Sequence, residues 1–395
     1  MVDAFGKCLS WREDEIAARM GVYPYYHAIE ERTGLNEVRV GGRTLLMAGS
    51  NDYLALSTDP RTKAAAAAAL RRFGAGTSGS RLTNGTLALH EELEAGLADF
   101  LGHEAALVTS TGFQANLALS PLLGPHDTLV ADQHIHASLI DAARLGQARL
   151  RRFRHNDMAH LGRLLDAAEP GDGLIILTEG MFSTTGDLCD LPGIGKLAAQ
   201  HGARLILDGA HDIGVLGPGG RGAADHYGQL PAVDVHTLTF SKCFGTLGGA
   251  VTGPERVIRY LRHHSRAAIF SASLPAPCAA AALAALEVIR TEPERRRRVL
   301  AIAERLGAEL AALGFDAGRD GTPTIPVHVG DTLPCLRLWT ELFEEGVFTN
   351  AMVPPGVPEG RALVRVAVTA AHTGAEVDRI VDAFAAAGRR LRLID

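Results

Sequence analysis

Hydrophobic and polar positions follow two alternating periods between residues 51 and 285. Stretches rich in alanine and leucine have the spacing of amphipathic helices, and the short apolar runs between them have the length of buried strands. The helical stretches are 62–73, 87–101, 137–145, 159–168 and 193–201, and the apolar runs are 105–109, 127–131, 149–153, 173–178, 203–207, 235–240 and 247–252. Buried strands that alternate with helices predict α/β architecture with a largely parallel sheet.

The regions on either side of this alternation have other patterns. Near the start, Glu37–Val40 and Arg43–Met47 flank two glycines and predict a hairpin. Later segments predict a long helical region, two strands and two further helices, at 278–313, 325–329, 362–368, 333–345 and 374–391. We therefore expect three parts: an N-terminal arm (1–50), a large domain (51–285) and a smaller α+β domain (286–395).

Composition narrows the class of protein. Of 395 residues, 47% are hydrophobic and 21% are charged, and the net charge is −6, which is typical of globular proteins. Positive residues are scattered, so no nucleic-acid footprint is expected. No apolar stretch is long enough for a membrane span. The five dispersed cysteines favour a reduced, cytoplasmic setting over a disulfide scaffold.

An aspartate follows one of the predicted strands, Leu205–Leu207, at the edge where ligands gather in α/β sheets. Asp208 can hold a positive charge there, such as that of a protonated pyridine nitrogen, which makes the ring an electron sink. His211 follows three residues later. Considered alone, Asp208 is as easily explained as a cap for the next loop.

A lysine stands in a similar position after a second apolar run, Leu238–Phe240. Partial burial favours the unprotonated amine, which is the form that attacks a carbonyl, so Lys242 is a candidate for a Schiff base. Thr239 and Ser241 could donate hydrogen bonds to a phosphate. A lysine that reaches solvent is the ordinary alternative, but Asp208, His211 and Thr239 together weaken it.

Three further segments supply candidate ligand contacts. A strand, a small polar turn and a helical pattern over Val108–Asn116 predict a phosphate site, with the amides of Gly112 and Phe113 as donors. The contacts expected from this turn are Ser110, Thr111, Gly112 and Phe113. In the second segment, Asp132–Ser138, His136 could lie flat over a ring, and in the third, Glu179–Ser183, Ser183 could reach a ring hydroxyl.

Two other kinds of site are less favoured. His134 and His136 would share one face of a strand, but no cysteine or carboxylate set with ligand spacing accompanies them, so we expect no metal. Gly74–Gly79 matches a dinucleotide-binding pattern, but it follows a helical stretch and not a strand.

Together these segments resemble the α-oxoamine synthase family of fold-type I pyridoxal-phosphate (PLP) enzymes. The resemblance extends from about residue 22 to 390, and its segments are Gly49–Leu54, Gly74–Arg81 with His90 and Glu94, Ser110–Asn116, His136–Ser138, Phe153–Asp157, Asp208–His211, Thr239–Lys242, Phe270–Pro275 and Arg365–Thr373. It implies a PLP-dependent transferase with a large, mostly parallel-sheet domain and a smaller α+β C-terminal domain. It also implies a homodimer with shared active sites.

The resemblance assigns a role to each candidate. Lys242 would carry PLP and later shuttle protons, Asp208 would pair with the pyridine nitrogen, and His136 would stack on the ring. The other implied contacts are His211 and Ser183 at the phenolic oxygen, Gly112, Phe113 and Thr239 at the phosphate, Ser271 and Ser273 from a second subunit, and Asn51 and Arg365 at the substrate.

The family condenses an amino acid with an acyl thioester of CoA or a carrier protein, and releases CO2 to give an α-amino ketone. Tyr23–Tyr26 and Val347–Pro358 resemble serine palmitoyltransferase-type members, with 8-amino-7-oxononanoate synthase second. Serine, alanine and glycine all remain open as the amino acid. A fold-type I aminotransferase or aldolase is the alternative of another class, since it would share Lys242 and Asp208.

The sequence also departs from the family pattern at three places. Gly209 replaces the usual acidic residue, Thr184-Thr185 replaces a Met-Asp or similar pair, and Ala272 stands where a hydroxyl or amide is common. These departures leave the catalytic set intact and leave the subfamily open.

Overall fold

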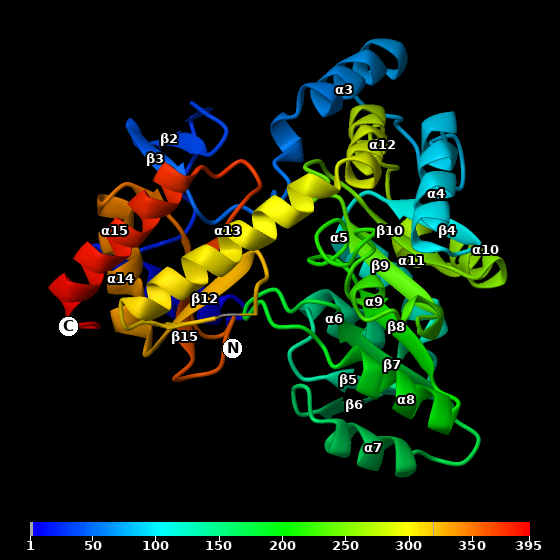
Figure 1. The fold of residues 1–395 in the computed structure, drawn as a ribbon. Helices are drawn as coiled ribbons and strands as arrows, with labels where there is room; N and C mark the ends of the chain where they lie inside the picture. Colours follow the sequence, from blue (N-terminus) through cyan, green and yellow to red (C-terminus); the bar gives the residue numbers. More distant parts are fainter. Residues whose placement is uncertain (1–2, 319) are drawn as a thin grey trace. The chain divides into compact units, whose positions relative to one another are not determined.

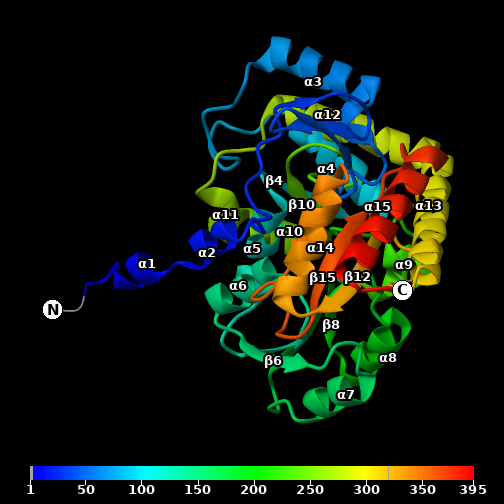
Figure 2. The same ribbon diagram turned by 90° about the vertical axis from the view of Figure 1, so that its left-hand side faces the viewer.

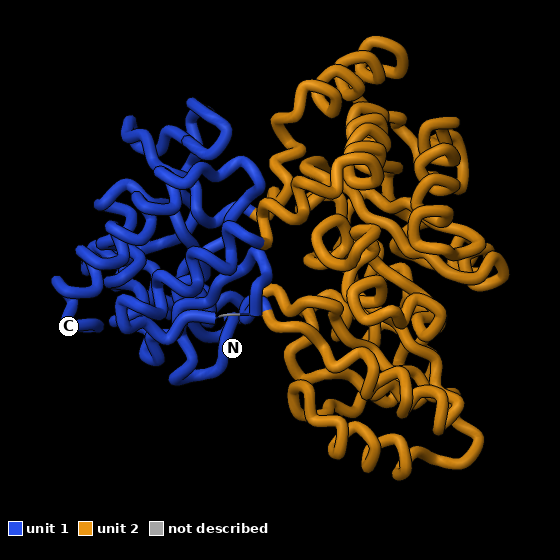
Figure 3. Tube along the Cα trace, in the orientation of Figure 1, with its two compact units in different colours: residues 1–50, 184–186, 301–395 blue, residues 51–183, 187–300 orange. Residues whose placement is uncertain are grey.

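The computed structural model describes residues 3–318 and 320–395, and the chain divides into two compact units (Figure 3). Unit 1 comprises residues 1–50, 184–186 and 301–395, and unit 2 comprises residues 51–183 and 187–300. The sequence placed boundaries at 50 and 285. In the structure, residues 1–50 group with the C-terminal segment, and the later boundary falls at residue 300, within α13 (Pro293–Ala312).

Unit 2 is built on one seven-stranded sheet (Figure 1). Its strands, in spatial order, are β4 (Ala105–Thr109), β10 (Gly249–Gly253), β9 (Val235–Thr239), β8 (Arg204–Asp208), β7 (Gly173–Glu179), β5 (Asp127–Asp132) and β6 (Arg149–Phe153). The pairs from β9 to β6 are parallel, and β10 runs antiparallel to both of its neighbours. The parallel strands therefore end at one edge of the sheet.

Helices bury both faces of this sheet, because alternate residues of each strand point to opposite sides. Leu129 and Ile206 join a core with α5 (Gly112–Ala118), α6 (Ala137–Gly146) and α10 (Glu255–His264), whereas Val130 and Leu205 join a core with α7 (Met158–Asp166) and α8 (Leu191–His201). The other helical segments of unit 2 are η1 (Leu56–Thr58), α3 (Pro60–Phe73), α4 (Ala88–Leu101), η2 (Ser120–Leu122), α9 (Ala223–His226), η3 (Leu230–Ala232), α11 (Arg266–Ile269) and α12 (Ala276–Thr291).

Unit 1 contains two four-stranded sheets. One has the order β1 (Glu31–Arg32), β2 (Glu37–Val40), β3 (Arg43–Met47) and β13 (Val347–Phe348), and the other has the order β11 (Asp316–Ala317), β12 (Thr324–Gly330), β15 (Ala362–Ala367) and β14 (Asn350–Met352). The helices α14 (Thr332–Glu344) and α15 (Gly374–Leu391) pack side by side (Figures 1 and 2). Two short helices, α1 (Gly6–Ser10) and α2 (Glu13–Arg19), lie near the N-terminus.

The predicted α/β alternation and the predicted hairpin are confirmed, with Val40 paired to Arg43 across the turn. The long helical region expected over 278–313 is confirmed as α12 and α13, with a break at Glu292 before Pro293, which lacks the N–H that a helix interior needs. The pattern also did not predict α10 or the short strands β11, β13 and β14. No helix among the described residues has the length and apolar character to cross a membrane.

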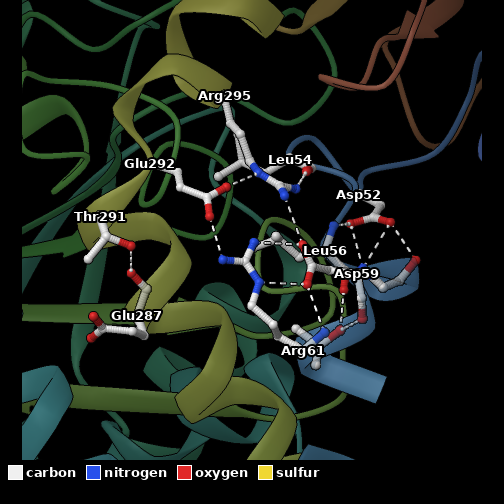
Figure 4. Close-up of polar contacts among 11 residues, drawn as sticks. Asp52, Leu54, Leu56, Asp59, Arg61, Glu287, Thr291, Glu292 and Arg295 are labelled. Atoms are coloured by element: carbon white, nitrogen blue, oxygen red, sulfur yellow. Dashed lines mark hydrogen bonds and ion pairs between the residues drawn. The ribbon is translucent and has the colours of Figure 1, made fainter. Parts of the chain in front are cut away.

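A network of ion pairs holds the start of unit 2 (Figure 4). Asp59 caps α3 by accepting from the Arg61 N–H at 2.9 Å, and its buried carboxylate also accepts from Arg295 at 2.8 Å. Hydrogen bonds from Arg61 lower the pKa of Asp59 to about 2, against the opposing effect of burial. Arg295 also donates to the carbonyl of Leu54 at 3.2 Å, so the network fixes the segment that carries Tyr53.

Candidate active site

A cavity of about 300 Å³ lies in unit 2, where β7, β8 and β9 end. Ligands collect at this edge of a parallel sheet, because the loops that follow the strands converge there. The cavity is lined by Thr111, Gly112, Phe113, Asn116, His136, Ser138, Glu179, Asp208, Ala210, His211, Leu238, Thr239, Ser241, Lys242 and Leu247. The structure thus brings together the predicted strand-end residues Asp208 and Lys242 with two of the predicted histidines, His136 and His211.

Lys242 and its neighbours follow β9 on one wall of the cavity. The hydroxyl of Thr239 lies 2.8 Å from that of Ser241, and it donates to the carbonyl of Gly248 at 3.1 Å. A Cβ on Gly112 would lie 2.5 Å from the Cβ of Thr239. Only glycine allows this close approach, which places the first amides of α5 beside the Thr239 hydroxyl.

Asp208 ends β8, and its carboxylate is buried. One oxygen accepts from Asn116 Nδ2 at 2.7 Å, and the other accepts from the Ala210 N–H at 2.9 Å. These donors compensate the loss of water around the carboxylate.

His136 stands at the N-cap of α6, and its ring faces the cavity. Its Nδ1 lies 2.7 Å from the hydroxyl of Ser138, and its backbone N–H donates to Glu179 at 2.5 Å. Partial burial lowers the pKa of His136, with the charge of Lys242 acting in the same direction and that of Asp208 opposing it. This shift favours the neutral imidazole.

His211 is held by an aromatic hydroxyl. Its Nδ1 lies 2.6 Å from the hydroxyl of Tyr53, which is fully buried, and the same hydroxyl donates to Asn51 at 3.4 Å. Tyr53 and His211 are 158 residues apart in the sequence. Their contact gives the imidazole one fixed orientation.

Carboxyl groups crowd the end of the sheet. Burial raises the pKa of Glu179 to about 8, and the negative charge of Asp208 acts in the same direction. Burial also raises the pKa of Asp212 to about 7, although the Ala223 N–H donates to it at 2.6 Å. At neutral pH, Asp208 thus has protonatable carboxyl neighbours in place of fixed negative charges.

Several predicted site residues lie outside the cavity lining. Ser110 donates to the carbonyl of Ala272 at 2.5 Å, and the hydroxyl of Ser273 lies 2.6 Å from that of Thr77. The other candidates that do not line this cavity are Ser183, Ser271, Asn51 and Arg365. Arg365 lies on β15 in unit 1, paired with Pro326 and Asn350. Its role, like the others, stays a prediction.

Three residues with polar side chains in the cavity lining received no role from the sequence: Asn116, Ser138 and Glu179. Each lies within a segment that the sequence marked as a candidate site, but the roles were given to neighbouring residues in those segments. The strand-end position of Glu179, which matches that of Asp208, was the available signal.

A second polar cluster lies at the end of β5. Asp132, His134 and His155 bring possible metal ligand atoms within 4.8 Å of one another. However, His155 Nδ1 lies 3.0 Å from Asp132 and its Nε2 lies 2.6 Å from Asp187. Burial opposes protonation of His155, but the hydrogen bonds with the two aspartates outweigh burial and raise its pKa to about 9. An imidazolium that is hydrogen-bonded to both aspartates accounts for the close approach of these side chains.

Residues 44–384 match the model of the family Aminotransferase class I and II, and the chain belongs to this family. It is 40% identical over 368 residues to a serine palmitoyltransferase from Bacteriovorax stolpii, covering 93% of this chain and 87% of that protein. It is 42% identical over 360 residues to an 8-amino-7-oxononanoate synthase from Symbiobacterium thermophilum, covering 90% and 91%.

One relative is much longer. A provisionally named 8-amino-7-oxononanoate synthase 2 from Mycobacterium tuberculosis is 44% identical over 368 residues, which is 92% of this chain. The chain spans only 47% of the length of that relative.

Solved structures resemble the whole chain. A variant serine palmitoyltransferase from S. paucimobilis with a bound PLP–myriocin aldimine has a TM-score of 0.96 at 33% identity, covering 100% of both chains. An 8-amino-7-oxononanoate synthase from Francisella tularensis has a TM-score of 0.74 at 27% identity, covering 88% of this chain and 98% of the other. The predicted family resemblance and the predicted fold class are confirmed.

The His155 cluster makes stability depend on pH. Because the folded pKa is raised above the unfolded value of about 6.5, the stabilisation is fully present below pH 6.5 and is lost as pH rises through about 9. We expect the His155 cluster to contribute a loss of about 3 kcal/mol of unfolding free energy across this window. Urea unfolding at several pH values measures the loss.

The matched variants are His155→Gln, which should show a flatter pH profile, and His263→Gln on the exposed surface of α10, which should keep the wild-type profile. A His155→Gln profile as steep as that of wild type would contradict the role given to the imidazolium.

Proposed function

We propose that this protein is a PLP-dependent acyltransferase of the α-oxoamine synthase type, which condenses an amino acid with an acyl thioester and releases CO2. The observation that carries the proposal is the single cavity that brings Lys242, Asp208, His136 and Thr239 together. The family match and the similarity to serine palmitoyltransferases and 8-amino-7-oxononanoate synthases support the same conclusion.

The cavity fits PLP. It is of a size that a small cofactor fills, and it offers an amine, a buried carboxylate and an imidazole. The missing Cβ of Gly112 leaves the first amides of α5 and the Thr239 hydroxyl close together, as a phosphate group requires. When bound, PLP supplies an electron sink for negative charge at the α-carbon of an amino acid.

The side chains of this chain have separate tasks. Lys242 would bind the cofactor through its Nζ, and the freed amine would take and return the α-proton of the amino acid. Asp208 would hold the proton on the ring nitrogen, since Asn116 and Ala210 keep its carboxylate in place. His211, oriented by Tyr53, would bind the phenolic oxygen.

The remaining assignments concern the substrate and a second subunit. The buried guanidinium of Arg365 suits a carboxylate, which it can bind bidentately, and Asn51 would be a second substrate contact. We propose a homodimer in which Ser271 and Ser273 reach the phosphate of the neighbouring site. Ser183 stays a proposed contact of the phenolic oxygen, and a cytoplasmic location stays part of the proposal.

Structural similarity favours a serine palmitoyltransferase-like reaction of L-serine with a long-chain acyl thioester. The TM-score is 0.96 against the serine palmitoyltransferase and 0.74 against the 8-amino-7-oxononanoate synthase. The second candidate is the 8-amino-7-oxononanoate synthase reaction of L-alanine with a pimeloyl thioester. Sequence identities of 42% and 44% to proteins with that name favour it.

The Schiff-base assignment is directly testable, because the sequence holds only four lysines: Lys7, Lys63, Lys196 and Lys242. Borohydride reduction of the PLP-loaded protein should attach the cofactor to Lys242 alone, since the other three do not line the cavity. Peptide mass spectrometry locates the label. Lys242→Ala should lose the near-visible absorbance band, and Lys196→Ala, at an exposed position of α8, should keep it. A label on another lysine would overturn the assignment.

The amino acid can be identified by absorbance titration of the PLP-loaded protein. L-serine should shift the near-visible band saturably, and at lower concentration than L-alanine or glycine, because the proposed reaction begins with that substrate. Saturation by L-alanine at the lowest concentration would favour the second candidate. A band that none of the three amino acids moves would argue against both.

A further inference from the structure

One continuous chain of hydrogen bonds joins the two sides of the cavity. Asn116 Nδ2 donates to Asp208 at 2.7 Å and to the hydroxyl of Ser138 at 2.9 Å. The Ser138 hydroxyl in turn lies 2.7 Å from Nδ1 of His136. Asn116, Ser138 and Asp208 are all buried, so water does not compete for these bonds.

The carboxylate at one end of this chain sets the direction of the two bonds that Asn116 makes. An ionised carboxylate only accepts, so the Asn116 amide must turn its NH2 group toward Asp208. Both N–H bonds of that group are then used, one for each partner. The opposite oxygen, Asn116 Oδ1, has no hydrogen-bond partner among the described residues, which is the cost of this orientation.

The imidazole of His136 is the acceptor at the other end of the chain of hydrogen bonds. The Ser138 oxygen accepts from Asn116, and its O–H is able to donate to His136 Nδ1 at 2.7 Å; a second donor at Nδ1 sets the direction of that bond. The backbone N–H of Ser138 also donates to Nδ1, at 3.3 Å. With two donors directed at it, Nδ1 is an acceptor, and the ring proton resides on Nε2.

We propose that Asn116 and Ser138 are positioning residues that connect Asp208 to His136 and hold this imidazole as the Nε2–H tautomer. Each acts through another side chain, Asn116 through Asp208 and Ser138 through His136. The Nε2–H is thereby presented as a donor for the carboxylate of an amino-acid substrate, a step that rests on the proposed function. The tautomer itself follows from the hydrogen bonds alone.

Other charged groups surround the two ends of the chain. His136 is faced by Lys242 after β9, by Asp141 on α6 and by Asp208. Asp208 also influences Glu179 on β7 and Asp212 on the following loop. A pH titration at this site therefore reports all of these groups together. Comparing variants separates the contribution of the Asn116–Ser138 hydrogen bonds from that of the other charged groups.

The first test uses the unmodified protein. Two-bond 1H–15N correlation spectra of protein labelled with 15N-histidine distinguish the two neutral tautomers, and loss of signals in His136→Gln identifies the residue. We expect His136 to be the Nε2–H tautomer at pH 7, with Nδ1 unprotonated. A proton on Nδ1 would overturn the proposal, whether or not the protein binds PLP.

The second test measures the pH midpoint of the near-visible band of PLP-loaded variants. Asn116→Ala and Ser138→Ala should each move the midpoint by about half a pH unit, because each breaks the link between Asp208 and His136. The double variant should move it no further than the larger single change, since both residues act through one chain. Ser138→Thr, which keeps the hydroxyl, should restore the wild-type midpoint.

Thr252→Val is the matched control, because it removes a buried hydroxyl from β10 that has no hydrogen-bond partner among the described residues. Its midpoint should equal that of wild type. Unmoved midpoints in Asn116→Ala and Ser138→Ala, or shifts that add in the double variant, would overturn the coupling. A wild-type protein without any near-visible band would instead overturn the proposed function, and the tautomer test would still stand.

Discussion

A carboxylate that is removed from water must be compensated by donors or by a positive charge, and this requirement organises the cavity around Asp208. The two donors described for it, Asn116 Nδ2 and the Ala210 N–H, are neutral. They hold the carboxylate in position without neutralising it. A protonated ring nitrogen would complete the compensation. The burial of Asp208, which is unfavourable in the protein without cofactor, would therefore favour binding of the cofactor.

The crowding of acids also explains the small residues around them. A Cβ on Gly180 would lie 1.9 Å from Asp212 Oδ2, so the Asp212 carboxylate can approach the backbone after β7 only because that position is glycine. At Gly209, a Cβ would lie 2.3 Å from Ile213 Cδ1 and 3.1 Å from Asp212 Oδ1. The acidic residue that the family usually carries at position 209 would not fit here, since Ile213 and Asp212 occupy its space.

The sequence predicted the elements whose signal is local and periodic. The strand ends that carry Asp208 and Thr239, and the helix at residues 374–391, could be located because apolar runs and caps mark them. The hydrogen-bonded chain could not be located. Asn116 lies 22 residues from Ser138 and 92 from Asp208, and no periodic pattern links such positions. The break at Pro293 was missed because alanine-rich helical periodicity continues on both sides of it.

The most direct test of the account is release of CO2 from carboxyl-labelled L-serine by the PLP-loaded protein, with and without a long-chain acyl-CoA. Lys242 and Asp208 alone are equally compatible with transamination, so loss of CO2 that depends on the thioester is what distinguishes the synthase. The account predicts label release only when the thioester is present, matched by an equal amount of free thiol. Formation of a keto acid with retention of the labelled carboxyl group would contradict it.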